Sequence, residues 1–490
     1  MQLLLLLAIF LSVLPNLPVG LLVHPVWSAA GTWGSVFALS FSAWSTGAFF
    51  TQHWNRRGVP ASLRWYRFLR GALYIGTAVV QFISLGIFSW GHWVRQISGF
   101  GDNLLLDELL VMSPLLFALA GLWWGIYPAE KTLYYHLGHR SASEFWTRMG
   151  YVLFQARTHV AMLFAPLLLY VAVQELGFVI QPESLLEGDW WGIYSMVISI
   201  LALLIVLLLM PWVLVRIWDT EPMPPGELRN LLVETAKRLG FCYTDFRIWH
   251  TQKNIANALV TGILPWPRYV VFSDGLLQAL SPEELVAVLG HEIGHVRRWH
   301  LPLYVALCVV ATTSGVQLLA WCWPGQKQYL MTMLLRLPTE LPDWLPWVEF
   351  GTGAAMLWSY VWVVFGYVSR QCEREADVYG CLAASYLTGT NDYRDDISEH
   401  SGGARILTKQ GIRTFIEALE KVAEVNGLPR TQWSWRHGSI ARRIAYLEKL
   451  EQRVAQGLTW PRWLWLRSWA ILVLLSLCVI WLYYSGLGIY

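Results

Sequence analysis

The stretch SPEELVAVLGHEIGHVRRW, residues 281–299, predicts a helix with a well-defined start. Ser281 can cap the amino terminus, Pro282 suits the first turn, and Glu284 can complete a capping box with the serine. Because each of these residues satisfies a requirement of a helix start, we expect the residues that follow to lie in helical register.

This helix carries the pattern H-E-x-x-H, formed by His291, Glu292 and His295. Residues four apart share one face of a helix, so the two imidazoles can bind one ion while Glu292 acts as a general base on water at that ion. Imidazole nitrogen suits zinc, and a catalytic zinc site has three protein ligands and an open position. The pattern therefore predicts one zinc ion (Zn2+) per chain and a third ligand elsewhere. The alternative is a helix with two histidines on its polar face and no metal.

A second polar stretch, SRQCEREADVYG at residues 369–380, offers the third ligand. Glu373 and Asp377 lie four residues apart and share a helix face, whereas Glu375 should point away, roughly 200° around the helix from Glu373. We therefore assign Glu373 as the third metal ligand. Asp377 can then accept a hydrogen bond from the outer N–H of a ligating histidine. A solvated helix beside the membrane is the alternative for these charged residues.

In order and spacing, four stretches resemble a family of integral-membrane zinc metallopeptidases that includes the CAAX prenyl endopeptidases and the HtpX-like bacterial proteases. The matching stretches are NALVTG at 257–262, RYVVFSDGLLQALSPEELVAVLGHEIGH at 268–295, SRQCEREAD at 369–377 and HGSIARRI at 437–444. The resemblance implies a gluzincin-type α+β zinc-protease domain that hydrolyses peptide bonds.

The resemblance also implies roles for a late histidine and arginine. His437 and Arg443 are expected to approach the substrate carbonyl and to help stabilise the oxyanion. Gly438 departs from the family, which usually has proline after this histidine.

A substrate-binding strand edge is a further implication of the resemblance. An extended peptide can pair with a free strand edge through main-chain hydrogen bonds, which do not depend on the identity of its side chains. The candidate positions are the segment at Asn257 and Ala258 and the strand at 269–272.

The composition of the whole chain indicates an integral membrane protein. Of its 490 residues, 55% are hydrophobic and only 14% are charged, with a formal net charge of +3. These figures exclude a disordered chain and a nucleic-acid-binding tail. A helix that crosses the lipid bilayer needs about 20 mostly apolar residues. About nine runs qualify, near residues 2–23, 30–50, 71–94, 109–127, 158–174, 190–215, 301–322, 350–368 and 469–487.

Positive charge sets the expected orientation. The loop at 51–70 holds arginines and no acidic residue, which predicts a cytoplasmic loop because Lys and Arg are retained on that side. We thus predict a mainly α, multi-pass protein of the bacterial inner (cell) membrane whose cytoplasmic zinc-protease domain is split by a transmembrane hairpin. The predicted parts are an amino-terminal multi-span region (1–218), two catalytic halves (219–300 and 369–467), the hairpin between them (301–368) and a carboxyl-terminal span (468–490).

Two other functions fit parts of this pattern. A multispan scaffold or transporter could hold a structural or catalytically inactive zinc site, and metal binding without hydrolysis would identify it. An intramembrane protease would place H-E-x-x-H inside an apolar helix, but charged residues flank the motif here and are costly in lipid. We therefore favour a zinc metalloendopeptidase that acts on protein or peptide substrates, membrane proteins among them. The residues do not identify the natural substrate.

Overall fold

The computed structural model describes residues 24–59, 62–97, 106–138, 145–180, 190–322, 355–356, 359–388, 407–456 and 469–477. The chain divides into two compact units, Met1–Thr220 and Glu221–Tyr490. Most of the described residues are helical, so the expectation of a mainly α protein is confirmed.

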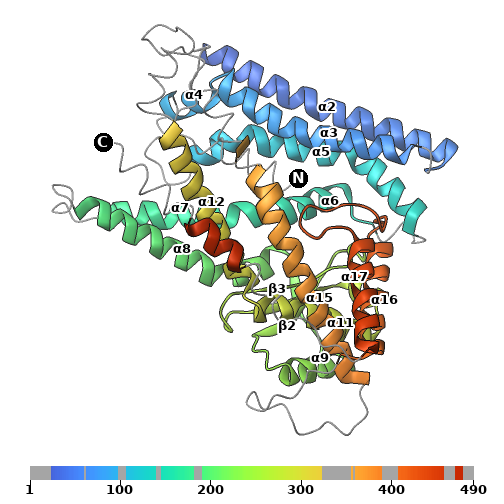
Figure 1. Ribbon diagram of the computed structural model, residues 1–490. Helices are drawn as coiled ribbons and strands as arrows, with labels where there is room; N and C mark the ends of the chain where they lie inside the picture. The colour runs from blue at the N-terminus through green and yellow to red at the C-terminus, as the bar shows by residue number, and fades with distance from the viewer. Residues whose placement is uncertain are drawn as a thin grey trace. The chain divides into compact units, whose positions relative to one another are not determined.

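The first unit consists of helices. They are α2 (Pro25–Arg57), α3 (Leu63–Gly86), α4 (Trp90–Ile97), α5 (Leu106–Gly138), α6 (Arg148–Gln155), the π-helical turn η2 (Ala156–Ala161), α7 (Met162–Ile180) and α8 (Trp190–Ile217). Helices α2, α3 and α5 run side by side (Figure 1). Gly47 and Gly125 lie at the contact between α2 and α5, where a Cβ on Gly125 would lie 2.5 Å from the backbone nitrogen of Trp44. Small residues of this kind let membrane helices approach closely.

Four described segments are long and apolar enough to cross a membrane. They are Leu63–Gly86, Asp107–His136, Arg148–Gly177 and Ile193–Ile217. The chain is thus an integral membrane protein, but the expected nine spans are not confirmed. The run at 2–23 lies outside the described residues, and those at 350–368 and 469–487 are described only in part.

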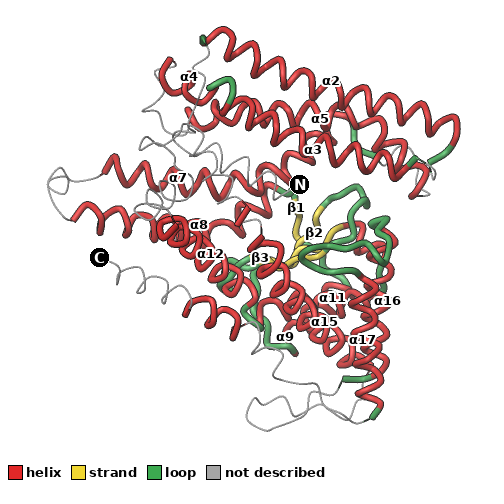
Figure 2. The backbone as a smooth tube through the Cα atoms, turned by 45° about the horizontal axis from the view of Figure 1, so that its top comes forward, coloured by secondary structure: helices red, strands yellow, loops and turns green. Residues whose placement is uncertain are grey.

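The second unit combines a small sheet with helices. Its elements are β1 (Thr220–Pro222), α9 (Glu227–Arg238), β2 (Asp245–Trp249), β3 (Ala258–Thr261), β4 (Tyr269–Ser273), α10 (Asp274–Ala279), α11 (Pro282–Arg297), α12 (His300–Cys322), the π-helical turn η4 (Val361–Phe365), α15 (Gly366–Thr388), α16 (Lys409–Val425) and α17 (Ile440–Ala455). The strands lie together beside the group formed by α11, α15, α16 and α17 (Figure 2).

The strand order explains which edge is open. The sheet has the order β1-β2-β4-β3, with β2 parallel and β3 antiparallel to β4. Strand β4 is therefore paired on both sides, and β3 lies at an edge. This corrects one expectation: the strand at 269–272 has no free edge for a substrate, because β2 and β3 already occupy both of its edges.

Helix α11 begins where its capping residues predict. Ser281 Oγ accepts a hydrogen bond from the Glu284 N–H, and the Glu284 carboxylate accepts one from the Ser281 N–H at 2.7 Å. The Glu284 side chain is buried and lies 2.7 Å from Lys421 Nζ of α16. The predicted capping box is confirmed, and it also ties the start of α11 to α16.

Glycines allow α11 to lie against α15. A Cβ on Gly290 would lie 2.3 Å from the Ala383 Cβ and 2.8 Å from the Tyr379 carbonyl oxygen. A Cβ on Gly294 would lie 2.8 Å from the Tyr379 Cβ and 3.0 Å from the Ala376 Cα. Gly290 precedes the H-E-x-x-H motif and Gly294 lies within it, so the close approach of the two backbones brings the two motifs together.

Adding a side chain at this contact should separate the helices. We expect Gly290→Val to lower the free energy of unfolding by about 3 kcal/mol, the upper end of what overpacking costs, because a backbone carbonyl cannot swing aside. Denaturation of the purified protein measures the effect. Gly226→Ala is the control, since no atom lies within 4 Å of a Cβ there. Equal stability of the two variants would mean that α11 and α15 are not closely packed.

Candidate metal centre

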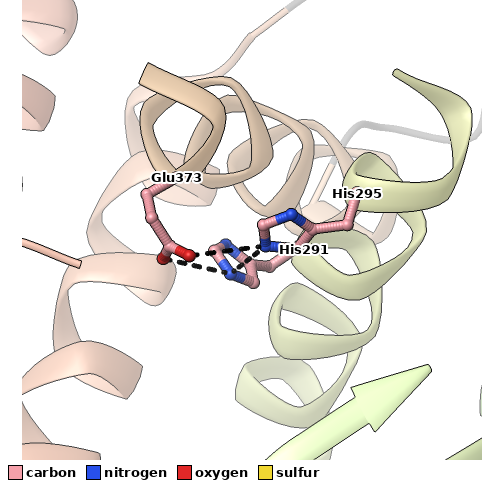
Figure 3. Close-up of side chains that lie close together, drawn as sticks. All are labelled: His291, His295 and Glu373. Atoms are coloured by element: carbon pink, nitrogen blue, oxygen red, sulfur yellow. Dashed lines mark hydrogen bonds and ion pairs between the residues drawn. The ribbon is translucent and has the colours of Figure 1, made fainter. Parts of the chain in front are cut away.

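Three side chains from α11 and α15 face one another (Figure 3). His291 Nε2 and His295 Nε2 lie 3.3 Å apart, and they lie 3.9 Å and 3.8 Å from the Glu373 carboxylate oxygens. Bonds of about 2.0–2.2 Å in a tetrahedral zinc site put neighbouring ligand atoms about 3.3–3.6 Å apart. The cluster therefore fits a zinc ion after a small inward movement of the carboxylate.

The protonation states of these groups also suit a cation. Burial lowers the pKa of His295 well below its usual value, which leaves a neutral imidazole with a free lone pair. Burial alone would raise the pKa of Glu373, but His437, Arg443 and His295 hold it well below its usual value. The cluster thus offers an anionic carboxylate and a neutral imidazole, a donor set that zinc prefers.

Asp377 lies directly behind the first histidine. His291 Nδ1 is 3.1 Å from Asp377 Oδ1, and the Asp377 side chain is fully buried. Burial lowers the pKa of His291, but the neighbouring Asp377 carboxylate outweighs it and raises this pKa above its usual value. The position is the one expected for an acceptor that orients a ligating histidine, and that role remains a prediction.

Arg443 contacts two of the carboxylates on α15, those of Asp377 and Glu373. Its Nε lies 3.0 Å from Asp377 Oδ2, its Nη2 pairs with Asp377 Oδ1, and its Nη1 lies 3.4 Å from Glu373 Oε2. Burial would raise the pKa of Asp377, but Arg443 and His291 keep it below its usual value. All three guanidinium nitrogens therefore face either Asp377 or Glu373, so the contact of Arg443 with a substrate carbonyl stays a prediction.

His437 lies at the exposed side of the cluster. Its Nδ1 is 2.8 Å from Glu373 Oε1, and 49% of its side chain is exposed. The following residue, Gly438, has φ +73°, a left-handed conformation that the fixed φ of proline excludes. The departure from the family at this position therefore has a backbone reason. Ser439 caps the helix α17 that carries Arg443.

Glu292 follows His291 on α11, and its carboxylate bonds to the Val260 backbone of strand β3. Burial, with the Glu373 charge, raises its pKa from 4.5 to about 7, although the neighbouring His291 and, to a smaller extent, the Val260 backbone oppose this shift. A carboxylate with a pKa near neutrality can both accept and release a proton, which suits a general base.

This pKa predicts a pH dependence of the zinc-free protein. A raised carboxyl pKa contributes stability that is present below about pH 4.5 and is lost as the pH rises through about 7, because the folded state resists ionisation. We expect zinc-stripped wild type to lose stability relative to Glu292→Gln between about pH 5 and pH 8. Melting curves of the wild type and of Glu292→Gln, recorded at both pH values, measure this difference in stability. If the melting temperatures of the two proteins change equally with pH, Glu292 ionises as freely in the folded protein as in water.

The segment at Asn257 and Ala258 lies at the free edge of the sheet. Ala258 begins β3 and pairs with Phe272, while the Asn257 N–H donates to Ser273 Oγ at 2.9 Å. Helix α11 packs against β3. The structure thus brings the expected substrate segment next to α11, the helix that carries Glu292, and its role in substrate binding stays a prediction.

Sequence reasoning missed one part of this region. Glu375 is not part of the metal cluster, in agreement with its helical phase, but it does not face solvent. Its carboxylate instead contacts the buried His300, at the start of α12. The available signal was a further histidine five residues after His295, which the H-E-x-x-H pattern does not include.

The described residues have the components of a metallopeptidase centre in an integral membrane protein: two histidines on one helix, a glutamate from a second helix and a glutamate beside the first histidine. Residues 222–451 match the model of peptidase family M48, which confirms the family resemblance drawn from the motifs.

Several proteins of this kind are similar to the chain. A "Protease HtpX homolog" of Moorella thermoacetica is 25% identical over 214 residues, which covers 41% of this chain and 64% of that protein. The "Probable CAAX prenyl protease 1" of Schizosaccharomyces pombe is 26% identical over 191 residues, or 39% of each chain. The chain thus spans less than two thirds of the length of these relatives. The crystal structure of S. mikatae Ste24p aligns with a TM-score of 0.40 and 17% identity over 86% of this chain and 98% of that one.

Proposed function

We propose that this protein is a membrane-embedded, zinc-dependent endopeptidase that hydrolyses peptide bonds of protein substrates. The observation that carries the proposal is the convergence of His291, His295 and Glu373, with Glu292 on the same helix as the two imidazoles. The protease names of the relatives support the reaction class. The arginines between residues 56 and 70, at the end of α2 and in the first turns of α3, support a cytoplasmic catalytic unit, because that stretch holds no acidic residue.

The proposed reaction divides the work among a few residues. An extended peptide pairs with the open edge of β3 from Ala258 onward, which aligns one peptide bond with Glu292. Asn257 holds the start of this strand in place, because its backbone N–H and carbonyl both bond to Ser273. A zinc ion held by the three ligands would polarise the carbonyl of that bond and make water more acidic. Glu292 takes a proton from the attacking water and passes it to the amine that leaves when the C–N bond breaks.

The remaining polar residues hold this arrangement. Arg443 neutralises the two buried carboxylates, Asp377 and Glu373, and keeps both in place. The half-exposed His437 is the better candidate for a contact with the substrate carbonyl, because its ring lies at the open side of the cluster.

Metal removal tests the proposal. We expect the full chain, purified in detergent, to contain one zinc per molecule and to cleave an unfolded protein such as casein. Chelation should abolish cleavage, and added zinc should restore it, because two imidazoles and a carboxylate alone supply no Lewis acid. Zinc assay and gel-based proteolysis measure both effects. Stoichiometric zinc without hydrolysis of any unfolded substrate would instead favour the scaffold or transporter alternative.

A further inference from the structure

A second chain of buried polar contacts reaches the metal cluster from α12. His295 Nδ1, the nitrogen that faces away from the cluster, lies 2.9 Å from His300 Nδ1. His300 Nε2 lies 3.2 Å from Glu375 Oε2. His300 and Glu375 are each only 2% exposed. Three residues from three helices therefore form a connected row that ends on a candidate ligand.

The chain reversal after α11 places this row. Helix α11 ends at Arg297, and Trp299 adopts a left-handed conformation with φ +57°. Helix α12 then begins at His300, whose ring lies across from His295 with a centroid distance of 5.0 Å. A left-handed tryptophan is strained, so the surrounding contacts must offset its cost. The polar contacts of His300 are among those that the reversal makes possible.

The row permits one proton arrangement that is compatible with metal binding. To bind an ion through Nε2, His295 must carry its proton on Nδ1, and that N–H can donate only to a bare Nδ1 of His300. His300 then carries its proton on Nε2 and donates it to the Glu375 carboxylate, which only accepts. The reverse tautomers would turn a lone pair of His300 toward that carboxylate and would protonate His295 at the metal side.

We propose that His300 and Glu375 are positioning residues that hold His295 in its metal-binding tautomer and orientation. The inference deepens the proposed function and rests on it. The two histidine ligands are then supported differently. Asp377 contacts His291 directly, whereas Glu375 acts on His295 through an interposed imidazole, which keeps its negative charge one ring further from the ion.

Zinc affinity separates positioning from simple packing. The full chain in detergent is stripped of metal, and its zinc dissociation constant is measured by competition with a chromophoric chelator. His300→Phe keeps a ring but removes both nitrogens, so zinc should bind 10- to 100-fold more weakly, the range for partners of metal ligands. Glu375→Gln keeps a hydrogen-bond acceptor and loses the charge, so we expect zinc to bind about tenfold more weakly, the lower end of this range.

A double variant and a conservative variant test the order of the row. If Glu375 acts only through His300, the double variant His300→Phe/Glu375→Gln should bind zinc no more weakly than His300→Phe alone. His300→Gln retains one acceptor and one donor and should recover most of the affinity. The matched control is His250→Phe, which breaks another histidine–glutamate pair, with Glu221 at 2.9 Å.

These measurements distinguish a positioning role of His300 and Glu375 from a purely structural one. If His300 and Glu375 only stabilise the fold, their variants should have a lower melting temperature without metal. The zinc dissociation constant of Glu375→Gln should then stay at the wild-type value, and that result would overturn the proposed positioning role. If His300→Phe does not fold, Glu375→Gln and His300→Gln carry the test by the same criterion. A wild-type chain that binds no zinc overturns the proposed function itself. If zinc binds tightly to the wild type and weakly to Glu375→Gln, the positioning role of His300 and Glu375 is supported, whether or not a peptide is cleaved.

Discussion

Glu292→Gln is expected to reduce proteolysis by about 10²- to 10⁴-fold, the range that a positioned general base contributes. Glutamine has nearly the same shape, so the packing of α11 against β3 should persist, but an amide cannot accept the proton of the attacking water. Zinc should stay bound, because Glu292 is not part of the cluster formed by His291, His295 and Glu373. Cleavage of an unfolded protein by the zinc-loaded variant measures the loss.

The control for this variant lies on the same helix. Glu283 is exposed in the first turn of α11, and Glu283→Gln removes an equal charge away from the cluster. Its activity should match the wild type. Comparable activity of the Glu292 and Glu283 variants would remove Glu292 from the mechanism, whereas loss of zinc from Glu292→Gln would indicate a structural role.

Glu373→Ala is expected to weaken zinc binding by more than about 100-fold, because even an outer partner of a ligand contributes 10- to 100-fold. The variant removes the only carboxylate of the cluster and leaves two imidazoles, which alone are a poor site for a doubly charged ion. It also leaves the buried Arg443 with Asp377 as its remaining carboxylate among the described residues. We therefore expect loss of both zinc and proteolysis.

Metal analysis after dialysis, followed by the proteolysis assay, tests this expectation. Glu417→Ala, at an exposed position on α16, is the control for the loss of a carboxylate in the same unit. Glu373→Asp keeps the charge on a shorter side chain and should retain part of the affinity. A Glu373→Ala protein with stoichiometric, tightly bound zinc would show that the third ligand is another residue.

Local sequence rules were sufficient for the elements that carry the site. The start of α11 follows from Ser281, Pro282 and Glu284, whose capping contacts involve neighbours in the chain. The choice of Glu373 over Glu375 follows from helical phase, and the structure places Glu373 beside the histidines. The start of α17 is likewise local, because the Ser439 side chain accepts a hydrogen bond from the Arg442 N–H. Each of these inferences depends on residues within a few positions of one another.

Features that depend on contacts between residues far apart in the sequence were harder to predict. The sequence left two strands open as substrate edges, and only the pairing of β4 with both β2 and β3 excludes the strand at 269–272. The burial of Glu375 was also missed, since it depends on His300, 75 residues away. Composition identified a membrane protein, but hydropathy alone did not fix the number of spans.

The sequence by itself determined the residue types of the site and their spacing, because the 3.6-residue period of a helix places His291 and His295 on one face wherever that helix lies. The tertiary structure decided which groups meet across helices: Glu373 with the imidazoles, Arg443 with two carboxylates, and His300 with His295. The first of these contacts depends on the close approach of α11 and α15 at Gly290, two helices that lie far apart in the chain. The contact of His300 with His295 depends on the left-handed turn at Trp299 between α11 and α12.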